Sequence, residues 1–156
     1  MVRTSFTAHV FMALALVANT PFPGLSAQTA SERPDPQPSI DLPDELSRVL
    51  RDYEQYWSNG QEDELAMLFV EEGLIVSRGS WIRGRDAIRE AYRTASGPLR
   101  LRAIEYAHGD NVGYIVGAYG YGDGSPPEDN GMFVLTLRRD SSGRWLIVSD
   151  MDRGVG

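Results

Sequence analysis

The sequence contains no cysteine and no lysine, so all 15 of its basic residues are arginine. Without cysteine there is no disulfide, no thiol nucleophile and no thiolate metal site. Without lysine, catalysis through a Schiff base is excluded. These absences leave carboxylates, tyrosines and a few histidines as the groups available for chemistry.

Histidine is also scarce, since the chain has only two. His9 lies in the apolar N-terminal stretch, and His108 lies beside Asp110 in AHGDN, a pattern typical of a solvated hairpin turn. A His-rich metal site is therefore excluded. The acidic loop at 122–131 lacks EF-hand spacing, and no phosphate-loop, GxSxG or dinucleotide motif occurs. We expect no metal and no cofactor.

Residues 1–27 have the parts of a secretory signal peptide. Arg3 precedes an apolar run at 6–18, and small residues follow. We expect cleavage after Ala27, with Ser26 and Ala30 as alternatives, and an exported protein that is periplasmic or secreted. The run is short for a transmembrane helix, and an uncleaved anchor is the alternative. After cleavage we expect no stable membrane insertion.

Residues 28–43 hold four prolines, which disfavour helix and sheet, so this segment is predicted to be a flexible linker. The folded domain is then 44–156. Residues 28–156 keep 14 arginines and all 22 acidic residues, which gives a net charge of −8. Such an acidic domain is poorly suited to nucleic acid or anionic lipid, and we expect no nucleic-acid partner.

Three helices are predicted from apolar residues at helical spacing, over 44–58, 61–72 and 85–95, with a short strand at 73–79. From residue 99 the apolar period changes to two, which predicts four strands over 99–108, 112–121, 132–140 and 144–152. A change of apolar phase near Ala103 indicates a β-bulge. The order predicts an α+β domain, with helices on one side of a bent antiparallel meander.

Three segments resemble the nuclear transport factor 2-like superfamily, in particular its SnoaL-like small stand-alone domains. Tyr53 to Trp57, followed by NGQEDELAMLFVEEGLIV, resembles its helix–turn–helix leading into a strand. WIRGRDAI at 81–88 resembles its strand–glycine–helix segment, and GRWLIVSDMD resembles its terminal strand. The likeness covers roughly residues 43–153.

The resemblance implies a cone-shaped curved antiparallel sheet packed by three N-terminal helices, with an internal pocket. It also implies a small hydrophobic ligand and a homodimer. Trp81 would pack on Tyr92 and cover the cone mouth, or would fill the core. The residues expected to line the pocket are Tyr53, Trp57, Leu65, Phe69, Trp81, Ile88, Tyr92, Phe133 and Trp145.

Asp150 and Asp152 are the sharpest functional signal in the chain. Their spacing places them on one face of the last strand, together with Leu146 and Val148. If that face is concave, Asp150 is a candidate general base with a raised pKa. If it is convex, which the pattern favours, both acids are solvated or paired with arginines such as Arg100.

Three functions stay open. The favoured one is a module that binds a small apolar ligand. The second is an isomerase, cyclase or dehydratase acting on a hydrophobic carbonyl compound, with Asp150 as base and Tyr53, Tyr106 or Tyr119 stabilising an oxyanion. The third is a dimerising domain with a filled cone. A large cavity would argue against the third, and an acid with a raised pKa inside it would favour the second.

Overall fold

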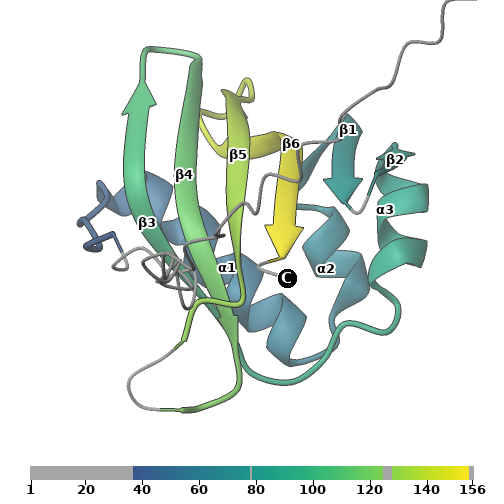
Figure 1. Ribbon diagram of the computed structural model, residues 1–156. Helices are drawn as coiled ribbons and strands as arrows, with labels where there is room; N and C mark the ends of the chain where they lie inside the picture. The colour runs from purple at the N-terminus through teal and green to yellow at the C-terminus, as the bar shows by residue number, and fades with distance from the viewer. Residues whose placement is uncertain (1–36, 78, 125–127, 155–156) are drawn as a thin grey trace, which may run out of the picture. The chain divides into compact units, whose positions relative to one another are not determined.

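The computed structural model describes residues 37–77, 79–124 and 128–154 (Figure 1). The predicted signal peptide, residues 1–27, and most of the predicted linker, residues 28–43, lie outside the described residues. Within the described part, no helix is long and apolar enough to span a bilayer.

The elements follow one another as α1 (Asp44–Ser58), α2 (Glu62–Ala66), β1 (Phe69–Ser77), β2 (Ser80–Arg83), α3 (Arg85–Tyr92), β3 (Leu99–His108), β4 (Val112–Tyr121), β5 (Gly131–Arg139) and β6 (Trp145–Gly154). The strands form one sheet in the order β2-β1-β6-β5-β4-β3. Neighbours are antiparallel except β1 and β6, which are parallel. The α+β class is confirmed, but the short hairpin strand β2 and the parallel pair were not predicted.

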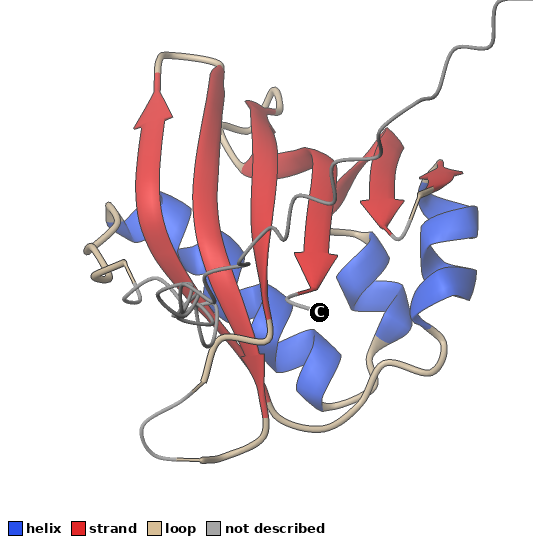
Figure 2. Cartoon of the chain, viewed as in Figure 1, coloured by secondary structure: helices blue, strands red, loops and turns tan. Residues whose placement is uncertain are grey.

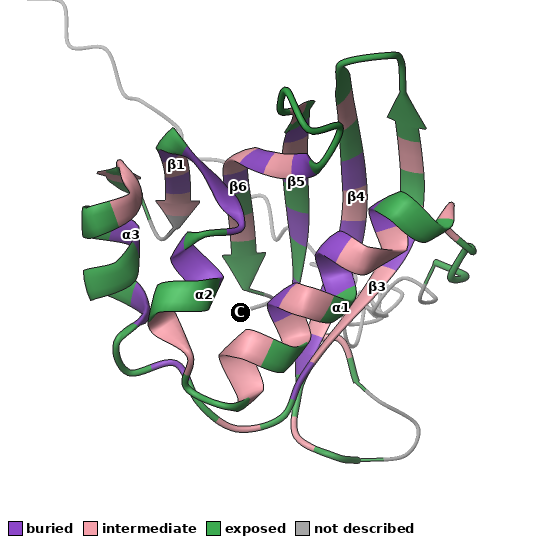
Figure 3. Ribbon diagram, turned by 180° about the vertical axis from the view of Figure 1, so that it is seen from behind, coloured by how far each residue is buried: buried purple, intermediate pink, exposed green. Residues whose placement is uncertain are grey.

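The helices pack against one face of the sheet (Figure 2). Helix α1 contacts β3 and β6, while α3 contacts β1 and β2. The apolar stripe of α1 is buried at Leu46, Val49, Leu50 and Tyr53 and half-buried at Trp57, while the outward side is exposed or half-buried (Figure 3). Each buried leucine or isoleucine contributes about 1.5–3 kcal/mol relative to exposure. The fully buried centre includes Leu46, Val49, Leu65, Phe69, Ile88, Ile115, Leu137, Trp145 and Ile147.

The second helix ends earlier than predicted. Helix α2 stops at Ala66, and β1 begins at Phe69 rather than at Gly73. The backbone N–H of Ile147 donates to the Leu68 carbonyl at 2.8 Å, and Phe69 is the register partner of Ile147. Pairing with the last strand therefore replaces the last turns of a helix that local propensity alone favours.

Two β-bulges, in β3 and β6, bend the sheet, and the register of β1 against β6 also shifts between Phe69 and Leu74. In β3 the register passes from Ala103 to Glu105 across from neighbouring residues of β4, so Ile104 is the extra residue and the predicted bulge is confirmed. In β6 the register passes from Ile147 to Ser149, which leaves Val148 as an extra residue. The second bulge was not predicted, and it changes which face of β6 carries the acids.

Residues 37–43, the end of the segment expected to be a linker, lie against β3. The Ile40 N–H donates to the Ala103 carbonyl at 3.0 Å. The Arg102 guanidinium donates to the Gln37 carbonyl at 2.6 Å and also pairs with Asp129. The prolines of this segment did not prevent it from making a backbone hydrogen bond to the sheet edge.

Candidate functional site

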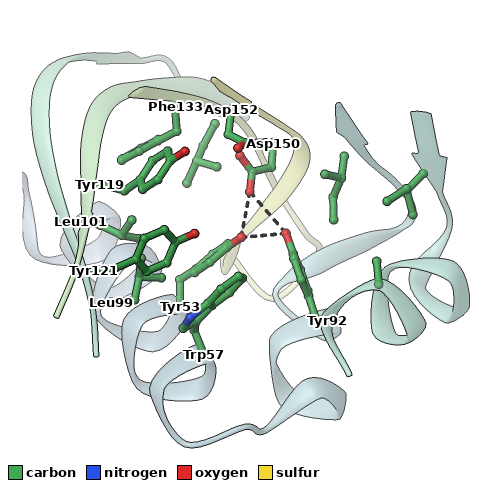
Figure 4. Close-up of a pocket in the computed structure, with 14 residues that line it drawn as sticks. Tyr53, Trp57, Tyr92, Leu99, Leu101, Tyr119, Tyr121, Phe133, Asp150 and Asp152 are labelled. Carbon is green, nitrogen blue, oxygen red and sulfur yellow. Dashed lines mark hydrogen bonds between the residues drawn. The ribbon is translucent and has the colours of Figure 1, made fainter. Parts of the chain in front are cut away.

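A cavity of about 370 Å³ lies between the concave sheet face and helices α1 and α3 (Figure 4). Six aromatic residues and several aliphatic side chains form its wall, and two carboxylates are the only charged side chains among the described lining residues. The lining residues are Tyr53, Trp57, Ile75, Ile82, Ala91, Tyr92, Leu99, Leu101, Tyr119, Tyr121, Phe133, Leu135, Asp150 and Asp152.

The bulge at Val148 places Asp150 in this cavity. Before the bulge, Trp145 and Ile147 face inward and are buried. After it, the inward-facing residues are Asp150 and Asp152. The prediction that these acids share a face with Leu146 and Val148 is therefore wrong, as is the preference for a convex, solvated Asp150. A strict alternation ignores the extra residue, which shifts the phase by one.

Two tyrosines from different helices hold Asp150. The Tyr53 hydroxyl on α1 donates to Oδ2 of Asp150 at 2.9 Å, and the Tyr92 hydroxyl on α3 lies 3.5 Å from the same oxygen. The two hydroxyls are 2.7 Å apart. All three hydrogen bonds appear as dashed lines in Figure 4. The cluster thus joins both helices to the last strand at one oxygen.

Burial dominates the electrostatics of Asp150. The residue is 6% exposed, and desolvation raises the pKa of its carboxyl to about 7. The hydrogen bonds from Tyr53 and Tyr92 act in the opposite direction, and the charge of Asp152 raises the pKa further. Burial, followed by the negative charge of Asp150, likewise raises the pKa of both tyrosines well above the usual range. Near neutral pH the carboxyl is therefore available in both protonation states.

The second oxygen of Asp150, Oδ1, is buried and has no hydrogen-bond partner among the described residues. An unpaired oxygen disfavours the ionised form and leaves a position at which a proton can reside without displacing a tyrosine. The geometry of the cluster therefore matches the raised pKa.

Glycines on the sheet leave room for two of the cavity rings. A Cβ on Gly117 would lie 2.3 Å from Cζ of Phe133, and one on Gly131 would lie 2.3 Å from the Tyr119 ring. Gly117 faces Phe133 and Gly131 faces Tyr119 in the β4–β5 register. Glycine at these two positions allows the rings to lie close to the backbone of the concave face.

The structure brings together most of the predicted site residues and separates others. Asp150, Tyr119, Tyr53, Trp57, Tyr92 and Phe133 all line the cavity. Leu65, Phe69 and Ile88 are fully buried in the core and do not line it. Trp145 is buried outside the cavity lining, where its ring faces that of His108. Tyr106 stacks on His108 and does not line the cavity either, so the oxyanion role considered for it lacks support.

Both interpretations of Trp81 are wrong. Its side chain is 70% exposed, so it neither fills the core nor covers the cavity. Trp81 lies on β2, opposite Val76, and its neighbour Ile82 is the residue that lines the cavity. The unpredicted strand β2 explains the difference, because alternation along a strand turns Trp81 outward when Ile82 faces inward.

Several lining residues were not predicted. Leu99, Leu101 and Tyr121 follow the period-two pattern of their strands, so a consistent assignment of the concave face identifies them. The position of Ile82 in the lining could be predicted only with knowledge of strand β2, and that of Asp152 only with knowledge of the bulge in β6. Among the residues that the structure describes, no three histidine, aspartate or glutamate side chains are grouped so as to hold a metal ion.

Solved structures show which fold this is. An NTF2-like protein of unknown function from Shewanella oneidensis superposes with a TM-score of 0.60 at 21% identity, covering 70% of this chain and 96% of that one. An NTF2-like protein with a cystatin-like fold from Novosphingobium aromaticivorans gives 0.57 at 16% identity, covering 71% and 80%. A ketosteroid isomerase-like protein from Erwinia carotovora gives 0.57 at 10% identity, covering 71% and 94%.

No protein-family model and no curated protein matches the sequence. The likeness is therefore one of structure, and at these identities it establishes the fold. The chain has the NTF2-like fold, as the resemblance in its sequence predicted.

Proposed function

We propose that this domain is an acid–base enzyme of the isomerase type, acting on a small, largely apolar molecule that carries a carbonyl group. The observation that supports this most is the buried carboxyl of Asp150, whose pKa is raised to about 7 in an aromatic cavity. A proton-transfer group works best when its pKa lies near the working pH. The ketosteroid isomerase-like neighbour adds an analogy of fold.

The proposed reaction moves one proton. Ionised Asp150 takes a proton from a carbon next to the carbonyl, and the C–H electron pair moves to the carbonyl oxygen to form an enolate. Asp150 then returns the proton to another carbon, which gives an isomer and restores the carboxylate. The Tyr119 hydroxyl is the proposed donor to the enolate oxygen, since Tyr119 lines the same cavity as Asp150.

A β,γ-unsaturated ketone such as cyclohex-3-en-1-one tests this proposal, since its conversion to the conjugated enone is followed by ultraviolet absorbance. We expect Asp150→Asn to lower the rate by about 10²–10⁴-fold, the usual contribution of a general base. Asp110→Asn, which removes an equal charge at an exposed turn, is the matched control. Equal rates for the unaltered protein and the Asp150→Asn variant would show that Asp150 is not the general base. If the folded protein isomerises no such ketone, the enzyme is excluded for this class of substrate, and a module that only binds a ligand becomes the favoured function.

The open cavity argues against a domain with a filled cone, but a homodimer fits another feature. The strand registers place Val116, Val134, Met151, Val76 and Trp81 side by side in one row across the sheet, on the face away from the helices. Each is exposed or half-buried in the single chain. We propose that a second copy covers this apolar row.

Light scattering after gel filtration tests the dimer. Met151→Arg places a charge in the row and should give a monomer, because an unpaired charge is costly in an apolar interface. Met67→Arg is the matched control, since Met67 is similarly exposed (53% against 49%) but lies outside the sheet. A dimer that tolerates Met151→Arg would place the interface elsewhere.

We also propose that the protein is exported. The support is the basic, apolar and small-residue order of residues 1–27. Mass spectrometry of the protein made in a bacterium with a secretory pathway should give a chain that begins at Gln28. Recovery of the full-length chain from the membrane fraction would support the anchor instead.

A further inference from the structure

The charges in the cavity are unbalanced. Asp150 and Asp152 both line it, and none of the arginines that the structure describes does. Elsewhere in the described domain, two half-buried aspartates have arginine partners: Asp52 pairs with Arg48 at 2.6 Å, and Asp129 pairs with Arg102. The half-buried Glu54 instead accepts a hydrogen bond from the Leu101 backbone N–H. Asp152 makes no ion pair within the described residues, and Oδ1 of the buried Asp150 makes no hydrogen bond there.

Aromatic rings that pack on one another line the same cavity as these carboxylates. Trp57 lies 6.4 Å from Tyr53 and 6.1 Å from Tyr121, measured between ring centroids, and Tyr121 lies 5.5 Å from Tyr119. The face of an aromatic ring carries negative charge, and Trp is the ring that attracts a cation most strongly. An assembly of several rings with carboxylates is the chemistry by which proteins recognise organic ammonium groups.

We propose that the ligand of this cavity is an organic cation, a protonated amine or a quaternary ammonium compound whose apolar part packs on the rings and whose charge lies near Asp152. This inference rests on the proposed function in taking the cavity as the substrate site, and it deepens that function by naming the charge of the substrate. A cationic group in the molecule would also favour the ionised form of Asp150, which is the form that accepts a proton.

Other ligand charges fit less well. An anion would meet two carboxylates and no positive side chain, so it is repelled. A neutral apolar molecule would fill the cavity but leave Asp152 without a partner. A metal ion needs several oxygen or nitrogen ligands, and the described residues hold no group of three suitable side chains.

Three compounds with the same phenylalkyl part and a positive, neutral or negative head group test the proposal: 4-phenylbutylamine, 4-phenylbutan-1-ol and 4-phenylbutanoate. Isothermal titration calorimetry of the full-length protein at about pH 8, where Asp150 is largely ionised, should show the amine binding about tenfold or more tightly than the alcohol. The carboxylate should bind least. Equal binding of the amine and the alcohol, tighter binding of the carboxylate, or no binding by any of the three would overturn the proposal.

Two substitutions sharpen the test. Asp152→Asn should reduce the advantage of the amine over the alcohol by about tenfold, whereas Asp110→Asn, with the same loss of charge at an exposed turn, should leave it unchanged. Trp57→Leu keeps an apolar wall without the ring, so it should weaken the amine more than the alcohol. An amine advantage that survives both Asp152→Asn and Trp57→Leu would show that the cation is not held in this cavity.

The pH dependence gives an independent readout. Asp150 faces Tyr53 on α1, Tyr92 on α3 and Asp152 on its own strand. Because its ionisation makes the cavity more negative, the affinity for the amine should rise as the pH passes about 7, while that for the alcohol stays flat or falls. An amine affinity that does not change with pH would contradict this coupling.

Failure of this inference and failure of the proposed function give different results. If the neutral unsaturated ketone is isomerised in a way that depends on Asp150, but the amine is not preferred as a ligand, the proposed enzyme is supported and the proposed cation site is overturned. If the amine is clearly preferred as a ligand but no ketone is isomerised, the proposed cation site is supported and the proposed enzyme is overturned.

Discussion

Two regions of the domain hold the same kinds of side chain and end in different states. Where β5 meets β6, Arg139 lies 4.7 Å over the Trp145 ring and pairs with Glu45. In the cavity, Trp57 and Asp152 are present, but no arginine belongs to the described lining. The first region contains its own cation, the Arg139 guanidinium. The hollow region has aromatic rings and carboxylates, but its described lining has no basic side chain.

The largest expected effect is on stability in the hollow region. Because folding raises the pKa of Asp150 from about 3.8 to about 7, the folded form favours the protonated carboxyl. The contribution of Asp150 to the free energy of unfolding should therefore be greatest below about pH 4, fall as the pH rises towards 7, and level off above it, by up to about 4 kcal/mol. Urea unfolding across this range measures the fall.

Asp150→Asn should remove that fall, since the amide does not ionise, and Asp110→Asn should retain it. A pH dependence that persists unchanged in Asp150→Asn would show that another group dominates the titration and that Asp150 is not held as described.

A smaller effect is expected in the first region, where β5 meets β6. Arg139→Ala removes the cation over Trp145 and the partner of Glu45, and should lower the free energy of unfolding by about 1–2 kcal/mol. Arg138→Ala is the control, because Arg138 is exposed and makes no ion pair within the described residues. Equal losses in the two variants would mean that the contact with Trp145 contributes nothing specific.

The smallest effect concerns the two tyrosines. Tyr53→Phe removes the 2.9 Å hydrogen bond to Asp150 and should raise the pKa of that carboxyl by about one pH unit. Tyr92→Phe removes a longer contact of 3.5 Å and should raise it less. The pH at which the stability curve levels off reports the folded-state pKa of Asp150 in each variant. A larger shift for Tyr92→Phe would reverse the assigned order of the two contacts.

Local patterns in the sequence were enough to predict much of the fold. The bounds of α1 follow from its apolar spacing and from Asn59-Gly60, and the β3 bulge follows from a phase change that is visible in LRLRAIEYAH. Both features depend on residues that are close together in the chain, so a short window contains the information.

Long-range pairing decided the features that were missed. Nothing in LIVSDMD marks Val148 as the extra residue, because the bulge is fixed by the partner strand β5. Phe69 leaves the helical pattern because of Ile147, which is far away in sequence. As a result, Asp150 was found as a candidate but was placed on the wrong face, and Trp81 was placed inside instead of outside.

The position of β6 has a consequence for how the chain folds. This strand lies between β1 and β5, so it joins the hairpin β1–β2 to the three strands β3–β5. On the ribosome, β6 is the last described strand to emerge, and until then the two groups of strands have no link through the sheet. Contacts so distant in sequence form slowly. The strand that carries Asp150 is thus also the one that completes the sheet, so a chain that stops before β6 loses the continuous sheet and the acid together.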